Sequence, residues 1–211
     1  MQKKKLVEQT TGKSRGNMLD IGAGTGAFLN TMKKANWDCT GIEPDKNARE
    51  KALELYGLHL KDAGTLYSFS PGSFDAITLW HVLEHVHELH KYTGQLRNLL
   101  SKDGKLFIAV PKYTSTDAKI YQEFWAAYDV PRHLYHFSPK SMEQLLNSHG
   151  LKLESTKPMW FDSVYVSMLS EKYKTGSTHP VKALLNGAFS NLKTIFDKRN
   201  CSSIIYIASL K

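Results

Sequence analysis

A short apolar segment followed by three closely spaced glycines constrains the fold of this chain more than any other feature. Met18–Ile21 predicts a buried strand, and Asp20 near its carboxyl end is placed to face a ligand crevice. Gly22, Gly24 and Gly26 allow the backbone to turn sharply and to approach a ligand, and the helix that begins near Gly26 directs its amide dipole at that ligand. This order of elements is typical of a nucleotide-cofactor site.

A second predicted strand, Asp38–Ile42, ends at Glu43, about twenty residues after the first glycine, where a carboxylate can accept both ribose hydroxyls of an adenosine. The segment Gly22–Ala27 also satisfies the dinucleotide fingerprint if alanine is allowed at its last position. A turn that only connects a strand to a helix is the remaining alternative. The glycines and Glu43 therefore predict an adenosine-containing cofactor but do not show which one it is.

Four motifs follow one another along the chain, at residues 19–26, 41–45, 73–86 and 99–111. Their sequences are Leu-Asp-Ile-Gly-Ala-Gly-Thr-Gly, Gly-Ile-Glu-Pro-Asp, Ser-Phe-Asp-Ala-Ile-Thr-Leu-Trp-His-Val-Leu-Glu-His-Val and Leu-Leu-Ser-Lys-Asp-Gly-Lys-Leu-Phe-Ile-Ala-Val-Pro. The series resembles that of class I S-adenosylmethionine-dependent methyltransferases. Within that class it most resembles the small-molecule branch that includes the ubiquinone-biosynthesis O-methyltransferases.

The resemblance implies S-adenosyl-L-methionine as the cofactor. Asp20, Gly22 and Gly24 would line its methionine end, and Glu43 would hold its ribose. Asp62, which follows a predicted strand at 58–60, would lie near adenine. The full set of expected cofactor-binding residues is Asp20, Gly22, Ala23, Gly24, Gly26, Glu43, Asp62, Trp80 and His81.

The expected fold is α/β: a doubly wound, Rossmann-like sheet of seven mostly parallel strands, with helical insertions between the last strands. The predicted strands are residues 18–21, 38–42, 58–60, 74–80, 105–110, 151–157 and 202–210. Helices are expected at Asp162–Tyr173 and Val181–Phe196. The 211 residues suit one domain, because no linker or composition shift divides them.

The net charge of +8 lies at the two ends of the chain. The short N-terminal segment 1–16 and residues 182–211 each hold five basic and one acidic side chain, whereas residues 17–181 sum to zero. This argues against a basic groove for a specific nucleic acid, although the ends can meet RNA or an anionic membrane surface; solvated ends are the simpler interpretation. With no apolar window of membrane-spanning length and no signal peptide, we expect a cytoplasmic protein.

Titratable side chains follow the predicted strand Phe74–Trp80, at the edge where open α/β sheets bind ligands. If this loop is helical, His81 and His85 stand one turn apart beside Glu84, which fits a general base or three ligands of a divalent cation. The ubiquinone-type enzymes carry the pattern Glu-x-x-Glu-His at this segment, and the pattern is linked with metal dependence. In this chain His81 stands where the first Glu would be. An imidazole is a poor ligand for Mg²⁺. The metal is therefore left open. His85 is the first choice for the base; the alternative is that Glu84 and His85 only hold the loop.

Ring side chains are dense in residues 113–137, around the turn Asp129-Val-Pro-Arg-His133. They indicate a lid over an aromatic or otherwise apolar acceptor, or a small satellite core. Related methyltransferases have a similar Pro-x-His-Leu element that helps to close the acceptor pocket, and His133 joins His85 and Glu84 as a catalytic candidate. Residues 111–141 and 158–200 are the expected acceptor-pocket or lid elements.

The predicted activity is methyl transfer to a small-molecule or lipid-like acceptor, with oxygen as the preferred accepting atom. Much of the rate would come from alignment of the reactants in a closed, dry pocket. Two alternatives remain at this point. One is an NAD-dependent oxidoreductase on the same glycine turn, and the other is a non-catalytic module for protein or RNA interaction that keeps the cofactor fold.

Overall fold

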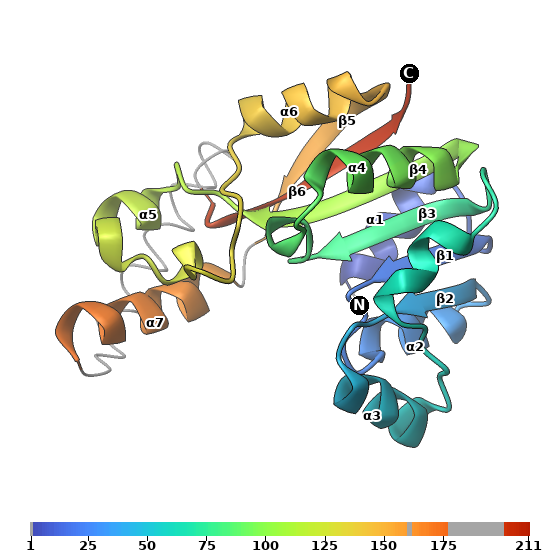
Figure 1. Ribbon diagram of the computed structural model, residues 1–211, viewed down its shortest axis with the longest axis horizontal. Helices are drawn as coiled ribbons and strands as arrows, with labels where there is room; N and C mark the ends of the chain where they lie inside the picture. The colour runs from blue at the N-terminus through green and yellow to red at the C-terminus, as the bar shows by residue number, and fades with distance from the viewer. Residues whose placement is uncertain (1, 160–161, 177–200) are drawn as a thin grey trace.

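A computed structural model of the chain describes residues 2–159, 162–176 and 201–211 (Figure 1). Six strands form one mixed sheet in the order β2-β1-β3-β4-β6-β5. The strands are β1 (Asn17–Ile21), β2 (Asp38–Ile42), β3 (Phe74–Trp80), β4 (Leu100–Pro111), β5 (Leu151–Pro158) and β6 (Ser203–Leu210). The first four strands run parallel, and β6 is antiparallel to both of its neighbours.

Helices cover both faces of the sheet. The α-helices are α1 (Gln2–Thr11), α2 (Ala27–Lys33), α3 (Lys46–Tyr56), α4 (Leu89–Leu99), α5 (Thr116–Tyr121), α6 (Pro139–Ser148) and α7 (Asp162–Thr175). The short 3-10 helices are η1 (Ala63–Ser68), η2 (Leu83–His85), η3 (Gln122–Phe124) and η4 (Ala126–Tyr128). None of the described helices is long and apolar enough to cross a membrane.

The alternation of side-chain direction along the strands produces a separate hydrophobic core on each face of the sheet. Met18 and Phe107 join Val7 of α1 and Met32 of α2 in one buried cluster. Their neighbours in the strands, such as Leu19, pack into the larger cluster with α4 and α6 on the other face. Since side chains of a strand point alternately to its two faces, these apolar strands are covered on both sides, as a parallel sheet requires.

The expected α/β doubly wound fold is confirmed, but the described residues form six strands and not seven. The predicted strand at 58–60 is wrong. Leu58 and Leu60 instead pack their side chains into the cluster with Leu29 and Ala52. The backbone pairs with β2 only at Lys61, whose N–H donates to Gly41 O at 2.8 Å. One pairing residue is enough for an isolated bridge and too few for a strand.

The other predicted strand boundaries agree with the structure to within one residue, except that β4 begins at Leu100 and not at residue 105. Asp45 caps α3 by accepting the Ala48 N–H at 2.8 Å, and Gly57 ends this helix with φ of 63°. Ser138 starts α6 with a capping box. The expected helix Asp162–Tyr173 is α7, whereas the expected helix Val181–Phe196 lies outside the described residues.

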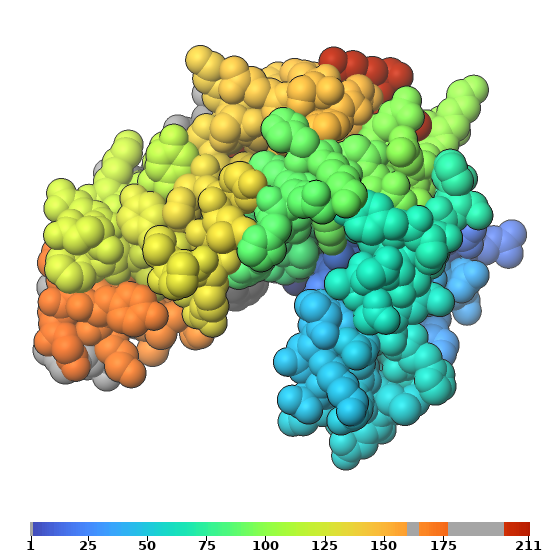
Figure 2. Space-filling model, in the orientation of Figure 1, coloured from blue at the N-terminus to red at the C-terminus, as the bar shows by residue number. Residues whose placement is uncertain are grey.

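The sheet positions the site at the carboxyl ends of β1 to β4. The strand order reverses at β1, because β2 lies on one side of it and β3 on the other, and ligands of open α/β sheets bind at such a switch point. Helices α5 and α7 extend beyond this edge, at the left in Figure 1. The face seen in Figure 2 is hollowed between this helical region and the part that holds α2 and α3.

Candidate functional site

The glycine turn after β1 is fastened to the end of β2. The backbone N–H groups of Gly22 and Ala23 both donate to Ile42 O, at 2.8 and 3.0 Å. Gly22, Gly24 and Gly26 all have positive φ, between 55° and 79°, a region that side chains rarely adopt. A Cβ at Gly22 would overlap Val82, whereas one at Gly24 would meet nothing within 4 Å. The turn therefore leaves open space above Gly24.

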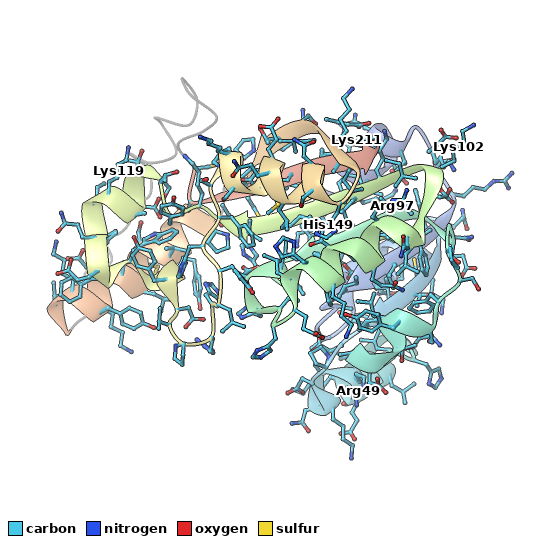
Figure 3. All side chains as sticks on the ribbon, turned by 45° about the horizontal axis from the view of Figure 1, so that its top comes forward. Arg49, Arg97, Lys102, Lys119, His149 and Lys211 are labelled. Carbon is cyan, nitrogen blue, oxygen red and sulfur yellow. The ribbon has the colours of Figure 1, made fainter. Side chains whose placement is uncertain are left out.

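Glu43 lies directly beside this open space. Its Oε2 accepts the Gly24 N–H at 2.7 Å, and its Oε1 accepts the Asp45 N–H at 2.9 Å. Arg49 of α3, labelled in Figure 3, donates to the Glu43 carbonyl oxygen at 2.8 Å. The carboxylate is only 8% exposed and is held in one orientation at the end of β2. Each of its oxygens keeps a further lone pair for a ligand hydroxyl.

Asp20 is a buried acid in β1. Its Oδ1 accepts the hydroxyl of Thr78 in β3 at 2.6 Å, and both side chains are shielded from solvent. Burial raises the pKa of Asp20 to about 7, against the opposing effects of the Thr78 hydrogen bond and the Lys3 charge. A buried carboxyl of this kind favours a cationic ligand group, because a nearby positive charge stabilises its ionised form.

Trp80 lies at the end of β3. Its ring packs edge-on against Phe28 of α2, with 5.5 Å between the centroids. The Lys3 ammonium of α1 lies 4.3 Å from the centre of the Trp80 ring. Lys3 is a residue of the site that the sequence analysis did not identify. Its only sequence signal is its place in the basic segment 1–16, which does not indicate where α1 packs.

Asp62 is exposed and caps η1, where its Oδ1 accepts the Gly64 N–H at 2.9 Å. The bridge between Lys61 and Ile42 holds this segment beside the end of β2, since the Glu43 N–H donates to Lys61 O at 2.9 Å. Asp62 therefore lies near Glu43, on the side that faces solvent. The expected cofactor residues are thus distributed over the turn, the end of β2 and the end of β3.

The loop after β3 is not an α-helix, so the condition under which His81 and His85 would stand one turn apart on a helix is not met. His81 has φ of 58°, and its N–H donates to Ala109 O in β4 at 2.9 Å. The chain then forms the 3-10 helix η2, which buries Glu84 and exposes His85. The His81 Nδ1 lies 3.4 Å from Glu84 Oε1. The positive φ ends the strand pairing and turns the loop toward the segment that holds His133.

Glu84 joins this loop to the chain around residue 134. Its backbone oxygen accepts the N–H groups of Leu134 at 2.8 Å and Tyr135 at 3.3 Å. Its side chain is fully buried, and neither carboxylate oxygen has a hydrogen-bond partner among the described residues. Leaving a buried polar group unpaired costs about 1–3 kcal/mol, and more for a charged group. Both oxygens of this carboxylate therefore remain available to accept a hydrogen bond from a ligand.

His133 lies against both Glu84 and His85. Its ring centre is 4.6 Å from that of His85, and its Nδ1 lies 2.8 Å from Ala127 O. Burial lowers the pKa of His133, so its neutral form is favoured at neutral pH. The His85 Nδ1 lies 2.9 Å from Arg132 O. Because a carbonyl oxygen can only accept, both rings carry their proton on Nδ1 and leave Nε2 with a lone pair.

Three side chains could hold a metal ion. One ligand atom from each of Glu84, His85 and His133 lies within 4.8 Å of the others. His81 is not in this group, although the sequence analysis considered it as a ligand with Glu84 and His85. The sequence analysis named His133 as a catalytic candidate together with His85 and Glu84, but only the tertiary fold shows that the His133 and His85 rings lie side by side, because 48 positions separate them.

A cavity of about 410 Å³ opens beside this cluster. It is lined by His81, Pro111, Ala126, Ala127, Asp129, Arg132, His133, Tyr165, Val166, Leu169 and Tyr173. The Arg132 side chain is paired with Asp129, with 2.7 Å between Nη2 and Oδ1, so this wall has no net charge. Arg97, Lys102 and Lys211 lie at the opposite end of the sheet in Figure 3.

Comparison with known proteins agrees with this geometry. The family model described as a methyltransferase domain matches residues 2–156. An uncharacterized methyltransferase of Bacillus mycoides is 31% identical over 117 residues, which are 54% of this chain and 55% of that protein. The chain thus spans about half the length of the curated relatives that it matches at this level.

A ubiquinone biosynthesis O-methyltransferase of Xanthomonas euvesicatoria is 28% identical over 159 residues, covering 69% of this chain and 66% of that protein. Among solved structures, a Burkholderia thailandensis 1,6-didemethyltoxoflavin N1-methyltransferase with bound S-adenosylhomocysteine superposes with a TM-score of 0.61 at 14% identity. The match covers 99% of this chain and 76% of that protein. At this identity the similarity shows a shared fold.

Proposed function

The chain belongs to the methyltransferase domain family, and we propose that it is an S-adenosylmethionine-dependent methyltransferase that methylates a small-molecule or lipid-like acceptor, with oxygen as the accepting atom. Membership of this family supports S-adenosylmethionine over a dinucleotide, and an enzyme over a non-catalytic module. The acceptor preference is supported by the cavity and by the titratable groups that border it.

The cofactor residues of this proposal are Asp20, Gly22, Ala23, Gly24, Gly26, Glu43, Asp62, Trp80 and His81. Bound S-adenosylmethionine supplies a methyl group on a positively charged sulfur. Glu43 binds the ribose hydroxyls through lone pairs that its two backbone hydrogen bonds leave available. Asp20 attracts the methionine ammonium, and the open space above Gly24 lets the cofactor approach the backbone.

The acceptor occupies the cavity bordered by His81, His133 and the exposed ring of Tyr165. A cavity of this volume suits one small ring system or part of a longer molecule. Segments 111–141 and 162–176 form its walls and exclude water around the reacting atoms. The neutral Arg132–Asp129 pair favours an acceptor without a large net charge on this side.

Proton removal from the acceptor is assigned to the cluster of His85, Glu84 and His133. In the metal-free protein the Nε2 lone pairs of the two imidazoles accept a proton, and His85 is the first choice because it is exposed. Glu84 stabilises the imidazolium that results, since it is a buried carboxylate beside both rings. An imidazole is suited to this task near neutral pH.

One observation carries the proposal: the hydrogen bond from Gly24 to Glu43 aligns a carboxylate with an open glycine turn at the carboxyl edge of the sheet. The test is a screen with S-adenosylmethionine labelled on the methyl group against metabolite and lipid extracts. We expect a labelled product from the wild-type protein and none from the Gly24→Val variant. Absence of any labelled product with a protein that binds S-adenosylhomocysteine would argue against an acceptor of these classes.

A further inference from the structure

The rings of His90 and His149 connect two helices that come from different parts of the chain. His90 lies in the first turn of α4, and His149 caps the carboxyl end of α6. The His90 Nδ1 lies 2.9 Å from the His149 Nε2, and the ring centres are 5.2 Å apart. The two positions are 59 residues apart in the sequence, so only the packing of α4 against α6 brings the rings together.

The His149 ring lies beside α4 at a point where this helix has no side chain. A Cβ on Gly94, one turn after His90, would lie 3.6 Å from His149 Nδ1. The same two helices bury Leu96 and Leu146 in the larger core, whereas His90 is exposed and His149 is half-buried. Because the rings lie at the edge of this packing, attraction or repulsion between them acts on the contact between the two helices.

The number of protons on the two rings decides whether they attract or repel each other. Between two neutral rings, one facing nitrogen donates its N–H and the other accepts with its lone pair. One added proton gives the bond N–H⁺···N, which is a charge-assisted and stronger hydrogen bond. A second added proton makes both facing nitrogens donors, so the bond is lost and two positive charges face each other.

The folded protein resists this second proton. Burial lowers the pKa of His149, and the charge of protonated His90 lowers it further. The unfolded chain therefore binds the proton more readily than the folded protein does. The contribution of the contact to stability is then present above the ordinary histidine pKa of 6.5 and is lost as the pH falls below it.

Two permanent cations flank the end of α6. The Lys211 ammonium donates to Asn147 O at 3.2 Å. A Cβ on Gly150 would lie 3.8 Å from Nε of Arg97, which belongs to α4. His149, Arg97 and Lys211 are labelled in Figure 3. Lysine and arginine keep their charge between pH 5 and 8, so these two groups do not produce a change in that range.

The remaining charged groups near His90 are either paired or directed elsewhere. On α4, Glu88 is paired with Lys91, with 2.9 Å between Oε2 and Nζ. His136 borders the same cavity of about 430 Å³ as His90, but its Nε2 lies 3.0 Å from Tyr128 O. Among these groups, histidine is the type of side chain that changes its charge near pH 6.

We propose that His90 and His149 form a pH-sensitive switch between α4 and α6, which holds the helices together until both rings are protonated. Helix α4 follows η2, which carries Glu84 and His85, and α6 follows the segment that carries His133. The switch therefore connects the two helices that continue from these segments. The inference does not depend on methyl transfer, since it concerns the stability of the contact between α4 and α6.

The experiment is a double-mutant cycle on the full chain, measured by urea denaturation at pH 8.0, 6.5 and 5.0 in buffer with a chelator. The cycle compares wild type, His90→Ala, His149→Ala and the double variant, so the titration of all other groups cancels. At pH 8.0 and 6.5 we expect the coupling to lower the unfolding equilibrium constant about 2- to 12-fold, as for one hydrogen bond. At pH 5.0 the coupling should vanish or become unfavourable.

A second measurement follows the ring signal of His149 by NMR as the pH changes. In the wild-type protein its midpoint should lie below pH 6.5, and His90→Ala should raise it toward 6.5 because the His90 charge is removed. His87→Ala is the matched control, since His87 is exposed and lies three residues before His90. This control should leave the His149 midpoint unchanged and show no coupling to His149→Ala.

Three results would overturn the proposal. The first is a coupling between positions 90 and 149 that is equal at pH 8.0 and 5.0, or absent at pH 8.0 and 6.5. The second is a His149 midpoint that His87→Ala moves as far as His90→Ala does. The third is a wild-type His149 midpoint at or above pH 6.5, which tests the switch without any variant.

Discussion

The backbone N–H of Gly24 donates to Glu43 Oε2 at 2.7 Å and thereby connects the turn after β1 to the acid that ends β2. The Asp45 N–H holds the other carboxylate oxygen at 2.9 Å. Two backbone donors therefore fix the carboxylate before a ligand arrives, so little side-chain freedom is lost when the ribose binds. This relationship makes Glu43 and Gly24 the first residues to test.

Replacement of Glu43 should weaken cofactor binding without unfolding the protein. Glu43→Gln should lose about 1–3 kcal/mol of S-adenosylhomocysteine binding, as expected for charge-assisted hydrogen bonds. Isothermal titration calorimetry measures the loss. Glu54→Ala, an exposed position on α3, is the control and should bind normally. Equal affinity of Glu43→Gln and wild type would remove Glu43 from the site.

The two glycines of the turn should respond differently to alanine. Gly22→Ala places a methyl group on Val82, so it should lower the melting temperature. Gly24→Ala meets no protein atom, and its positive φ of 55° costs only about 1 kcal/mol. It should instead reduce cofactor affinity. Thermal unfolding and calorimetry on the pair separate the two effects, and the reverse order would contradict this assignment of the open space.

Cofactor binding should strengthen with pH up to neutrality. Burial raises the pKa of Asp20 to about 7 in the free protein. The ionised form attracts the methionine ammonium, so binding lowers this pKa. Affinity should then rise by up to about tenfold per pH unit below pH 7 and level off above it. Asp20→Asn should abolish this dependence in titrations at pH 5.5, 6.5 and 8.

The raised pKa of Asp20 also affects the stability of the folded protein. The pKa of Asp20 is higher in the folded protein than its ordinary value of 3.8, so the folded state holds a proton that the unfolded state has released. The free protein should therefore lose stability as the pH rises from about 4 through 7.

Thr78→Val removes a hydrogen bond that lowers the pKa of Asp20, so this variant should move the midpoint of cofactor binding to higher pH.

His85→Ala should spare cofactor binding and lower turnover by about 10²–10⁴-fold, the range of general acid–base catalysis. His87→Ala, at an exposed position two residues away, is the matched control and should keep full activity. Both variants are compared at saturating cofactor with the acceptor found in the screen. Normal turnover of His85→Ala would exclude His85 as the group that receives the proton.

A buried acid outside the cluster of Glu84, His85 and His133 should control the stability of the helical region that borders the cavity. Asp117 of α5 accepts the Trp125 Nε1–H at 2.8 Å and the Ser202 hydroxyl at 2.6 Å. Asp117→Ala leaves both donors unpaired in the interior and should lower the free energy of unfolding by about 2–5 kcal/mol. Urea denaturation measures this loss. Asp103→Ala, at an exposed position, should change stability by less than about 0.5 kcal/mol.

Local signals predicted the elements from β1 to α3 well. The spacing from Gly22 to Glu43 is that of one strand, one turn, one helix and a parallel strand, and right-handed connection of such units leaves little freedom in where Glu43 arrives. Asp45, Gly57 and Ser138 stand at helix termini, where capping depends on neighbouring residues only. The strand at 58–60 was wrong because pairing with β2, and not local composition, decides whether three residues form a strand.

The sequence by itself determined the glycine turn after β1, the position of Glu43 at the end of β2 and the class of fold, because these follow from short-range spacing and from the alternation of apolar residues. Only the tertiary structure decided that Glu84 is buried without a partner, that His133 lies beside His85, and that Lys3 reaches Trp80. These contacts join elements far apart in the chain. Their geometry depends on how loops and helices pack at the edge of the sheet, which no local pattern encodes.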